Sequence, residues 1–311
     1  MTGVLTIGEA MVSLRTHTPM ALGGTAQLSM AGSESNVAIG LARLGHDVAW
    51  LGVVGKDQPG DLIRRTLRAE GVDTRLVRSA DEAFTGFIAF DQPAHDITRV
   101  SYHRKGSAGS LLTAKECLAA LEATAPSLLH LTGITPALSP AAREAILSAG
   151  RTAHATGVRV SLDVNHRSRL WSRQDAAEAL RALLPSIDIV FASRDELDIL
   201  APTAHPVADL LDLGVTEIVV TAGADGADCH TPDEVLHQAA LPVTVVDSIG
   251  AGDAFVSGYL SALLDGLPHR DRLRRGAATG AFCVGAHGDW EALPTRRSLE
   301  LLSHGEGTAM R

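Results

Sequence analysis

Residues 245–255 read VVDSIGAGDAF, in which two valines lead into a glycine-rich turn and apolar residues follow it. Gly250 and Gly252 have no side chains, so backbone N–H groups at this turn can approach a ligand closely. The pattern predicts a strand, a turn and then a helix whose N-terminus carries a partial positive charge. Such a turn is an anion hole suited to a phosphate group. Working outward from it, we expect a fold in which strands are followed by helices.

Short apolar segments rich in β-branched residues alternate with helical patterns along the rest of the chain. The expected strands are Val4–Ile7, Val48–Val54, Leu128–Leu131, Val158–Val164, Ile187–Phe191, Glu217–Thr221 and Val243–Val246. The expected helices are Ser35–Leu44, Gly60–Glu70, Pro140–Thr156, Arg173–Leu184, Arg194–Ala201, Gly252–Leu264 and His269–Gly285. Continuous apolar strands are typical of a parallel sheet covered on both faces. The alternation predicts a doubly wound α/β fold with a mostly parallel sheet flanked by helices.

Two stretches interrupt this alternation. Ser13–Met30 is polar, and Phe84–His103 alternates apolar with polar residues in part. The second stretch predicts antiparallel strands, with which the first can pair. We interpret the segments at about 13–30 and 84–105 as a small β-sheet lid over one edge of the main sheet. Because the chain has no Pro- or Ser-rich linker and no internal repeat, residues 1–311 are predicted to form a single domain.

The composition argues against several classes of protein. The 311 residues carry a formal net charge of −9, whereas nucleic-acid binding depends largely on Lys and Arg. No apolar run approaches the ~18 residues of a membrane span, and residues 1–8 predict a first strand rather than a signal sequence. The three cysteines form no CxxC pair, which argues against a zinc site or a disulfide framework. We expect a cytoplasmic protein with reduced, buried cysteines, no nucleic-acid partner and no membrane partner.

Asp253 ends the glycine-rich turn and is the candidate for chemistry. A carboxylate inside an anion hole is unexpected in a site that only binds anions. It is expected if Asp253 removes a proton from an attacking hydroxyl while the hole holds the transferring phosphoryl group. The alternative is an Asp that only complements the helix dipole, and the whole string favours catalysis. The chain contains neither GxxxxGK followed by Ser or Thr nor GxGxxG, which argues against a P-loop kinase and a dinucleotide-binding protein.

The string DSIGAGD at residues 247–253 resembles the DTxGAGD signature of the ribokinase-like (PfkB-type) carbohydrate kinases, with Ser248 in place of the usual Thr. Residues 31–45, AGSESNVAIGLARLG, are similar to the family's N-terminal motif, and residues 55–60 are similar to its GxDxxG turn. The resemblance extends over residues 7–293. It implies a ribokinase-like kinase with a small β-sheet lid, in which Asp253 is the base acting on a sugar hydroxyl. The other residues that it implies are the anion hole, Gly250, Ala251 and Gly252, and two sugar contacts, Gly32 and Asn36.

Two further strings resemble the family's motifs for nucleotide and metal. Residues 221–226, TAGADG, are similar to its KxGxxG nucleotide loop, with Thr221 in place of the common Lys. The resemblance implies that ATP contacts Thr221, Gly223, Gly226 and also Gly252. Residues 193–196, SRDE, are similar to an NxxE motif associated with Mg²⁺ and phosphate, which implies Glu196 at the metal and Ser193 at the nucleotide. From the residue alone, Glu196 is an ordinary acid at the start of a helix.

Four more strings are similar to segments of 2-keto-3-deoxygluconate kinases within this family. They are YHRKGSAGS at residues 102–110, HLTGITPAL at 130–138, DVNHRSRLW at 163–171 and GDWE at 288–291. The resemblance implies that Tyr102, Arg104 and Asp289 bind the substrate. It places Arg167 on the substrate side and Asn165 on the nucleotide side of the same region. The predicted reaction is transfer of the ATP γ-phosphoryl group to a primary hydroxyl of 2-keto-3-deoxygluconate or a related sugar acid.

Arg104 supports an acidic substrate on physical grounds, because a guanidinium binds a carboxylate through two parallel hydrogen bonds. Considered alone, Arg104 and Lys105 suit a solvated lid edge equally well, and the flanking residues favour the ligand role. Ile88 stands where these kinases often carry a Tyr, and it cannot donate a side-chain hydrogen bond. The alternatives are a kinase for fructose, ribose, 5-keto-2-deoxygluconate or a nucleoside, and a sugar-sensing protein of the same fold without activity.

The predicted partners are small molecules, namely a sugar or sugar acid, ATP and Mg²⁺. Many relatives also need a monovalent cation, a requirement that this sequence does not decide. Lid strands with apolar faces often pair, which predicts a homodimer. The 13 histidines are scattered without the spacing of metal ligands, and we interpret them as surface or supporting groups.

Overall fold

The computed structural model describes residues 3–16, 18–94 and 97–299; residues 17, 95 and 96 of the predicted lid segments lie outside this range. Its strands are β1 (Val4–Ile7), β2 (Met11–Arg15), β3 (Gln27–Ala31), β4 (Val48–Leu51), β5 (Val53–Gly55), β6 (Arg78–Ala80), β7 (Phe87–Ala94), β8 (Ile97–His103), β9 (Leu128–Thr132), β10 (Arg159–Asp163), β11 (Ile189–Ser193), β12 (Glu217–Thr221), β13 (Ala227–His230) and β14 (Val235–Gln238). Its helices are α1 (Ser33–Arg43), α2 (Gln58–Ala69), α3 (Ala114–Thr124), α4 (Pro140–Ala155), α5 (Arg173–Arg181), α6 (Leu197–Leu200), α7 (Pro206–Asp212), α8 (Ala251–Leu264), α9 (His269–Val284) and α10 (Arg296–Leu299).

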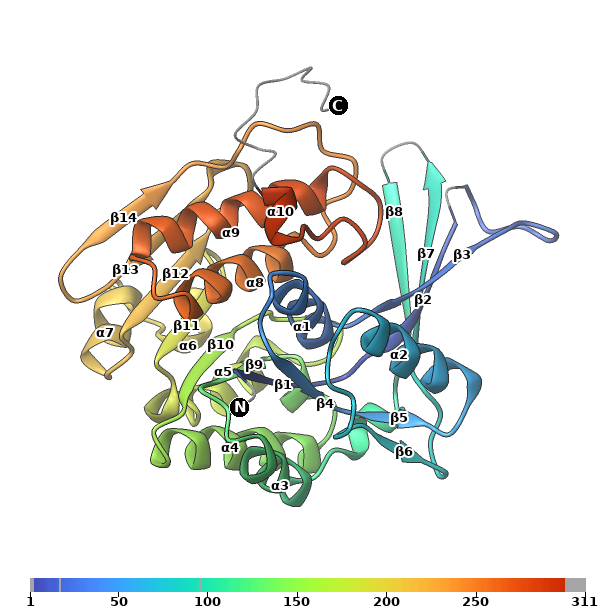
Figure 1. Cartoon of the computed structure of the whole chain (residues 1–311), viewed down its shortest axis with the longest axis horizontal. Helices are drawn as coiled ribbons and strands as arrows, with labels where there is room; N and C mark the ends of the chain where they lie inside the picture. The colour runs from blue at the N-terminus through green and yellow to red at the C-terminus, as the bar shows by residue number, and fades with distance from the viewer. Residues whose placement is uncertain (1–2, 17, 95–96, 300–311) are drawn as a thin grey trace.

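The largest sheet has eight strands in the order β14-β13-β12-β11-β10-β9-β1-β4. The six strands from β12 to β4 are parallel, and the hairpin β13–β14 adds an antiparallel edge. The strands β1 and β9 are buried along their whole length, which explains why their sequences, VLTI and LLHLT, are mostly apolar. Figure 1 shows helices on both sides of this sheet, and the predicted α/β fold with a mostly parallel sheet is confirmed.

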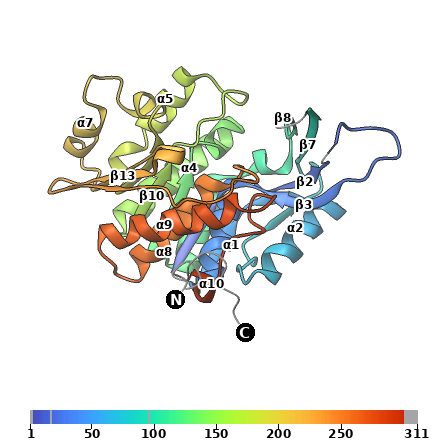
Figure 2. The same cartoon turned by 90° about the horizontal axis from the view of Figure 1, so that it is seen from above.

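The helices form two layers, one on each face of the main sheet (Figure 2). On one face α1 and α8 pack together, and one hydrophobic cluster there includes Trp50, Phe191 and Tyr259. On the other face α3 packs against α4, over a second cluster that includes Leu129 and Leu162. Both clusters exclude water from the sheet, so the strand ends are held rigidly. No helix among the described residues is long and apolar enough to cross a membrane.

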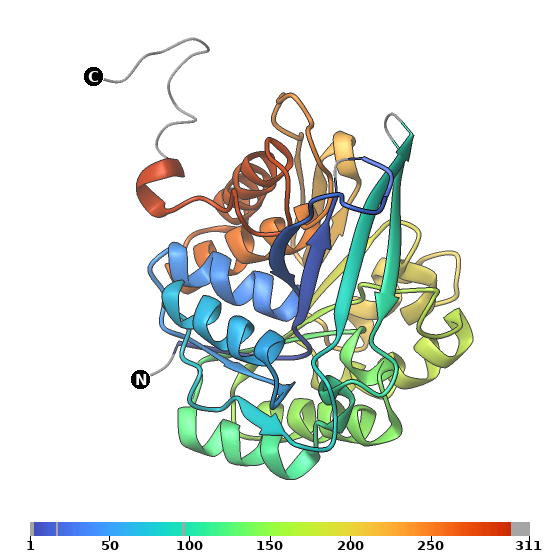
Figure 3. The same ribbon diagram turned by 90° about the vertical axis from the view of Figure 1, so that its right-hand side faces the viewer.

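A second, four-stranded sheet has the order β3-β2-β7-β8. Figure 3 shows these strands side by side, beyond the edge of the main sheet. Strands β2 and β3 come from the first predicted lid segment and β7 and β8 from the second, and the parallel pairing of β2 with β7 joins the two segments. The predicted small sheet is therefore confirmed, while its role as a moving lid stays a prediction.

Two predicted strands differ from the structure. Val243–Val246 forms no strand: Val245 is 64% exposed, and the backbone N–H of Val246 donates to the carbonyl oxygen of Val284 at the end of α9. The prediction was wrong because the hairpin β13–β14 pairs with β12 and occupies that edge of the main sheet. The strand predicted at Val48–Val54 divides at Gly52: β4 joins the main sheet, whereas β5 pairs with β6 in a separate sheet of two strands.

Helix bounds changed less, although three helices, α3, α7 and α10, were not predicted. The helix predicted at Arg194–Ala201 is reduced to α6, and the one predicted at Arg173–Leu184 ends as α5 at Arg181. Helix α3 was not predicted, even though its N-terminus has a recognisable signal. Thr113 and Glu116 form a capping box there, in which each side chain bonds the other residue's backbone N–H.

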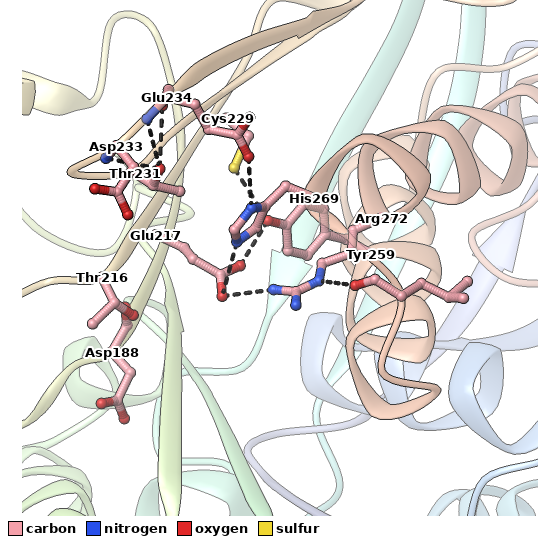
Figure 4. A network of polar contacts seen from close by, with 11 residues as sticks. Asp188, Thr216, Glu217, Cys229, Thr231, Asp233, Glu234, Tyr259, His269 and Arg272 are labelled. Carbon is pink, nitrogen blue, oxygen red and sulfur yellow. Dashed lines mark hydrogen bonds and ion pairs between the residues drawn. The ribbon is translucent and has the colours of Figure 1, made fainter.

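A buried polar network joins the main sheet to the two helices that follow it (Figure 4). Glu217 of β12 accepts a hydrogen bond from the hydroxyl of Tyr259 in α8 at 2.7 Å. The same carboxylate accepts a hydrogen bond from Arg272 Nη1 in α9, also at 2.7 Å. The thiol sulfur of Cys229 in β13 lies 3.3 Å from the Tyr259 hydroxyl. The network therefore fixes α8 against the sheet, several turns away from the glycine-rich turn at the start of that helix.

Candidate active site

A cleft of about 490 Å³ lies between the carboxyl ends of the main-sheet strands and the small sheet. Ligands commonly bind at the carboxyl ends of strands in α/β sheets. The loops that follow β1, β10 and β12, or the ends of these strands, contribute Glu9, Asp163, Asn165 and Thr221. The small sheet contributes Met11, Ala31, Ile88, Phe90, Val100 and Tyr102. The cleft thus has a polar wall on the main sheet and a largely apolar wall on the small one.

The glycine-rich turn lies along one side of the cleft. Gly250 is the residue before α8 and has a φ of 79°, a left-handed conformation that favours glycine. Asp247 holds the turn, since its Oδ1 accepts a hydrogen bond from the backbone N–H of Ile249 at 3.0 Å. No side chain caps the N-terminus of α8. The N–H of Ala251 donates to the carbonyl oxygen of Ser248 at 3.4 Å. The N–H groups of Gly252 and Asp253 are therefore the ones available to an anion, which the helix dipole favours.

Asp253 lies in the first turn of α8 and is only 7% exposed. Its Oδ1 accepts a hydrogen bond from Ser33 Oγ at 2.6 Å, and its Oδ2 accepts one from Asn36 Nδ2 at 2.8 Å. Both donors belong to α1, which packs against α8. The two hydrogen bonds fix the orientation of the carboxylate at the wall of the cleft, next to the turn that can hold an anion.

Three other buried acids surround Asp253. Burial raises the pKa of Glu34 to about 7 and that of Asp289 to about 7. Burial also raises the pKa of Asp163 well above its ordinary value. The negative charge of Asp253 acts in the same direction on all three. Near neutral pH Glu34 and Asp289 are therefore partly uncharged, and an uncharged carboxyl group can donate a hydrogen bond to a ligand.

The polar wall on the main-sheet side is built around Asn165 and Glu196. Asn165 has a φ of 39°, and its Nδ2 donates to Ser33 Oγ and to Asp163 Oδ2, each at 3.0 Å. A non-glycine residue in this region is often strained and held by its function. Glu196 accepts hydrogen bonds from the backbone N–H and the hydroxyl of Ser193, at 2.9 and 2.8 Å, and from the backbone N–H of His166. Its carboxylate is therefore fixed at the wall.

Mg²⁺ is the metal that the resemblance implies, and the donor set of the wall fits it. Mg²⁺ prefers oxygen ligands, keeps several waters and takes only one or two carboxylates beside substrate phosphates. Glu196 and Asp163 both line the cleft with their carboxyl oxygens, and the negative charge of Glu196 contributes to the raised pKa of Asp163. Among residues 3–16, 18–94 and 97–299, no group of three or more His, Cys, Asp or Glu side chains forms a closed metal site. Two carboxyl groups, Glu196 and Asp163, suit an Mg²⁺ ion that is also bound by nucleotide phosphates.

On the opposite side of the cleft, Arg104 is paired rather than free. Its guanidinium is 8% exposed and forms an ion pair with the buried carboxylate of Glu9. The hydroxyl of Ser107 donates to the same carboxylate, and the Arg104 guanidinium lies 5.8 Å from the ring centre of Tyr102. Arg167 is exposed at the cleft's rim. A guanidinium has five N–H donors, so Arg104 can serve Glu9 on one edge and a ligand on another.

The structure brings most of the predicted site residues together. Those that line the cleft are Gly32, Asn36, Tyr102, Arg104, Asn165, Arg167, Ser193, Glu196, Thr221, Gly250, Gly252, Asp253 and Asp289. Ala251, Gly223 and Gly226 do not line the cleft, so their predicted roles stay predictions. Gly226 has a φ of 99° and packs so closely on the backbone of Gln238 that the fold alone requires a glycine there.

The cleft is also lined by four acids and hydroxyls that the sequence patterns had not indicated, namely Glu9, Ser33, Glu34 and Asp163. A usable signal was present for two of them, because polar residues at the carboxyl end of an apolar strand point to a site in an α/β fold. Glu9 follows β1, and Asp163 ends β10. Ser33 and Glu34 lie inside the AGSESN motif, between two residues that were predicted to bind the sugar.

Comparisons with known proteins show similarity over nearly the whole chain. A family model described as pfkB family carbohydrate kinase matches residues 1–296. The chain is 36% identical to a 2-dehydro-3-deoxygluconokinase from Bacillus subtilis (strain 168) over 306 residues, which cover 95% of this chain and 93% of that protein. It is 37% identical to a 2-dehydro-3-deoxygalactonokinase from Haloferax volcanii over 300 residues, or 92% of each protein.

Solved structures show the same architecture. A PfkB protein from Polaromonas sp. JS666 has a TM-score of 0.85 and 34% identity, and the match covers 96% of this chain and 99% of that one. A provisionally assigned ribokinase II from E. coli, solved in complex with ATP and Mg²⁺, has a TM-score of 0.89 and 25% identity, with 98% and 100% of the two chains covered.

Proposed function

Because this chain belongs to the PfkB family of carbohydrate kinases, we propose that it transfers the γ-phosphoryl group of ATP to a primary hydroxyl of a sugar acid. The proposed substrate is 2-keto-3-deoxygluconate, also called 2-dehydro-3-deoxygluconate, or a close relative of it. The observation that carries the proposal is the position of Asp253, a carboxylate oriented by Ser33 and Asn36 beside the anion-binding turn. The names of two relatives that are 36% and 37% identical support the class of substrate.

In the proposed reaction Asp253 is the general base. Its carboxylate accepts the proton as the sugar hydroxyl oxygen forms a bond to the γ-phosphorus, and the bond from that phosphorus to the bridging oxygen of ATP breaks. The N–H groups at Gly250–Gly252 and the N-terminus of α8 stabilise the charge on the transferring group. Glu196 and Asp163 would hold Mg²⁺, which when bound neutralises charge on the ATP phosphates. Thr221, Ser193 and Asn165 bind the nucleotide on the same wall.

Recognition of the sugar acid is assigned to the opposite side of the cleft. Arg104 and Arg167 provide the positive charge for the carboxylate of the substrate, and Tyr102 adds an aromatic wall with a hydroxyl group. Gly32 allows the chain to approach the sugar, and Asp289 is available as a hydrogen-bond donor or acceptor to its hydroxyls. Ile88 and Phe90 are both buried at the cleft and offer no polar group to the substrate on this side.

Three further properties belong to the same proposal. The small sheet closes over the bound substrate as a lid and excludes water. The outer face of that sheet pairs with a second copy, which is supported by Leu28 and Ile97, each 57% exposed. The enzyme acts in the cytoplasm, which is supported by three buried, unpaired cysteines within the described range. Analytical ultracentrifugation checks the homodimer, and a monomer at micromolar concentration would contradict it.

The test measures ATP turnover with Mg²⁺, with and without K⁺, against 2-keto-3-deoxygluconate, 2-keto-3-deoxygalactonate, 5-keto-2-deoxygluconate, fructose, ribose and a nucleoside. We expect turnover of a 2-keto-3-deoxy sugar acid, and a fall of about 100-fold or more in kcat for Asp253→Asn. The matched control is Asp61→Asn, because Asp61 also lies in the first turn of a helix but is exposed, and its kcat is expected to stay unchanged.

The outcomes separate the alternatives. Turnover of a neutral sugar alone would retain the kinase and discard the role of Arg104 with a carboxylate. Binding of a sugar acid without turnover, unaffected by Asp253→Asn, would favour a sugar-sensing protein of the same fold. Turnover that Asp253→Asn leaves intact would overturn the role of Asp253 as the base.

A further inference from the structure

Arg15 is a buried cation that leaves the small sheet and reaches the other side of the cleft. It is the last residue of β2, and it is 7% exposed. Its Nη1 lies 2.8 Å from Asp247 Oδ2, and its Nη2 lies 3.5 Å from Asp289 Oδ1. The two carboxyl side chains are about as buried as the guanidinium, so all three groups have lost most of their water. Removing one partner from such a buried group leaves an unbalanced charge.

The small sheet determines the direction of this guanidinium. Phe90 is the residue beside Arg15 on the neighbouring strand β7, and the guanidinium carbon lies 4.3 Å from the centre of its ring. A guanidinium stacks favourably on an aromatic face. Because Phe90 also lines the cleft, Arg15 is held by the same part of the sheet that faces the substrate.

The two acids that Arg15 joins belong to the two backbone segments that shape the glycine-rich turn. Asp247 accepts the backbone N–H of Ile249 through Oδ1 while it meets Arg15 through Oδ2. The backbone of Asp289 packs directly on Gly250, with no room for a β-carbon between them. The positive charge of Arg15 lowers the pKa of Asp289, whereas the negative charge of Asp247 raises it, so Arg15 offsets the repulsion between the two acids at the base of the turn.

We propose that Arg15 is a positioning residue that couples the small sheet to the phosphoryl-binding turn, acting through Asp247 and Asp289. The turn takes its reactive shape when the small sheet lies against the cleft, because Arg15 then contacts both Asp247 and Asp289. Arg15 does not touch the reacting atoms. The proposal rests on the proposed phosphoryl transfer for its kinetic consequence, while its structural consequence, the order of residues 247–252, is independent of the substrate.

The test compares Arg15→Met, which removes the charge and keeps much of the length, with Arg15→Lys, which keeps the charge. The matched control is Arg99→Met, because Arg99 also pairs with an aspartate of the small sheet, Asp91, through two hydrogen bonds but is 63% exposed and does not reach the turn. For each variant kcat and KM for ATP and for the sugar acid are measured, together with hydrogen–deuterium exchange of the amides at residues 247–252.

We expect Arg15→Met to lower kcat by roughly 10- to 100-fold, with both KM values changed by less than about threefold. Arg15→Lys recovers a large part of kcat, and amide exchange at residues 247–252 is faster in Arg15→Met than in the wild type or in Arg99→Met. A folded Arg15→Met protein with unchanged exchange at the turn would overturn the proposal, and so would an effect confined to KM. If Arg15→Met fails to fold, exchange in Arg15→Lys decides in the same way.

The same design separates this proposal from the proposed function. If the wild-type enzyme phosphorylates no sugar acid, the proposed function fails, and the exchange measurement alone still decides the coupling. If the wild type is active and Arg15→Met is equally active with an equally ordered turn, only the coupling fails.

Discussion

The α-carbon of Gly250 faces the carbonyl oxygen of Asp289 with no space for a side chain between them. Gly250 also has a φ of 79°, which L-amino acids with a β-carbon rarely adopt. Gly252, two residues further on, has an ordinary conformation, and a β-carbon added there would meet no heavy atom within 4 Å. The two glycines of the turn are therefore required for different reasons, one by the fold and the other by the open space in the cleft.

Alanine substitutions are expected to separate these reasons. Gly250→Ala should lower the free energy of unfolding by about 2 kcal/mol or more, because it adds backbone strain and an overlap with Asp289. Gly252→Ala should leave stability nearly unchanged and lower kcat by about tenfold or more, because its methyl group enters the space of the transferring phosphoryl group. Urea unfolding and steady-state kinetics check both variants. Equal stability of the two variants would contradict the assignment of Gly250.

The buried carboxyl group of Glu34 should make stability depend on pH. Burial raises its pKa from 4.5 to about 7, while the hydroxyls of Thr132 and Thr135 donate to its Oε1. Because the folded protein holds this proton more tightly than the unfolded chain, the contribution to stability is complete below about pH 4.5 and is lost as the pH rises through 7. The whole effect is up to roughly 3 kcal/mol.

Glu34→Gln removes this titration and retains an oxygen that accepts from both threonines. Between pH 5 and pH 8 the free energy of unfolding of the wild type should therefore fall more steeply than that of Glu34→Gln. Denaturant unfolding at several pH values measures the two slopes, and Glu122→Gln, at an exposed position of α3, is the control. Asp289, whose pKa is also raised to about 7, contributes equally to both proteins and cancels. Parallel slopes would show that Glu34 does not titrate in this range.

The network in Figure 4 predicts a contrast between a buried and an exposed ion pair. Arg272→Met removes the nearest cation from the carboxylate of Glu217, which is 7% exposed and keeps only the Tyr259 hydroxyl and His269, 3.8 Å away. The variant should lower the free energy of unfolding by about 3 kcal/mol. Arg75→Met removes a two-pronged pair with Asp73 in which the Arg75 side chain is 85% exposed, and should change stability much less than Arg272→Met does. Thermal and urea unfolding compare the variants, and similar losses for both would refute the structural importance of the network.

The prediction from sequence was most successful where structure is determined by neighbours along the chain. Apolar runs of four or five residues placed β1, β9 and β12 almost to the residue, and the glycine-rich turn placed the start of α8. The resemblance to a kinase family added the order of the motifs, and most residues named from those motifs line one cleft. Val243–Val246 shows the limit of such patterns. Its β-branched composition is that of a strand, but the adjacent sheet edge is already paired with β13.

By itself, the sequence determined the α/β class, the small second sheet, the glycine-rich turn and the aspartate beside it, because these depend on short-range periodicity and on glycine. Only the tertiary structure decided that Glu9 pairs with Arg104, that Ser33 orients Asp253 and that Arg15 bridges Asp247 and Asp289. Arg15 and Asp247 are 232 positions apart. Which buried charges meet depends on how two sheets and their loops pack, and no local pattern in the chain contains that information.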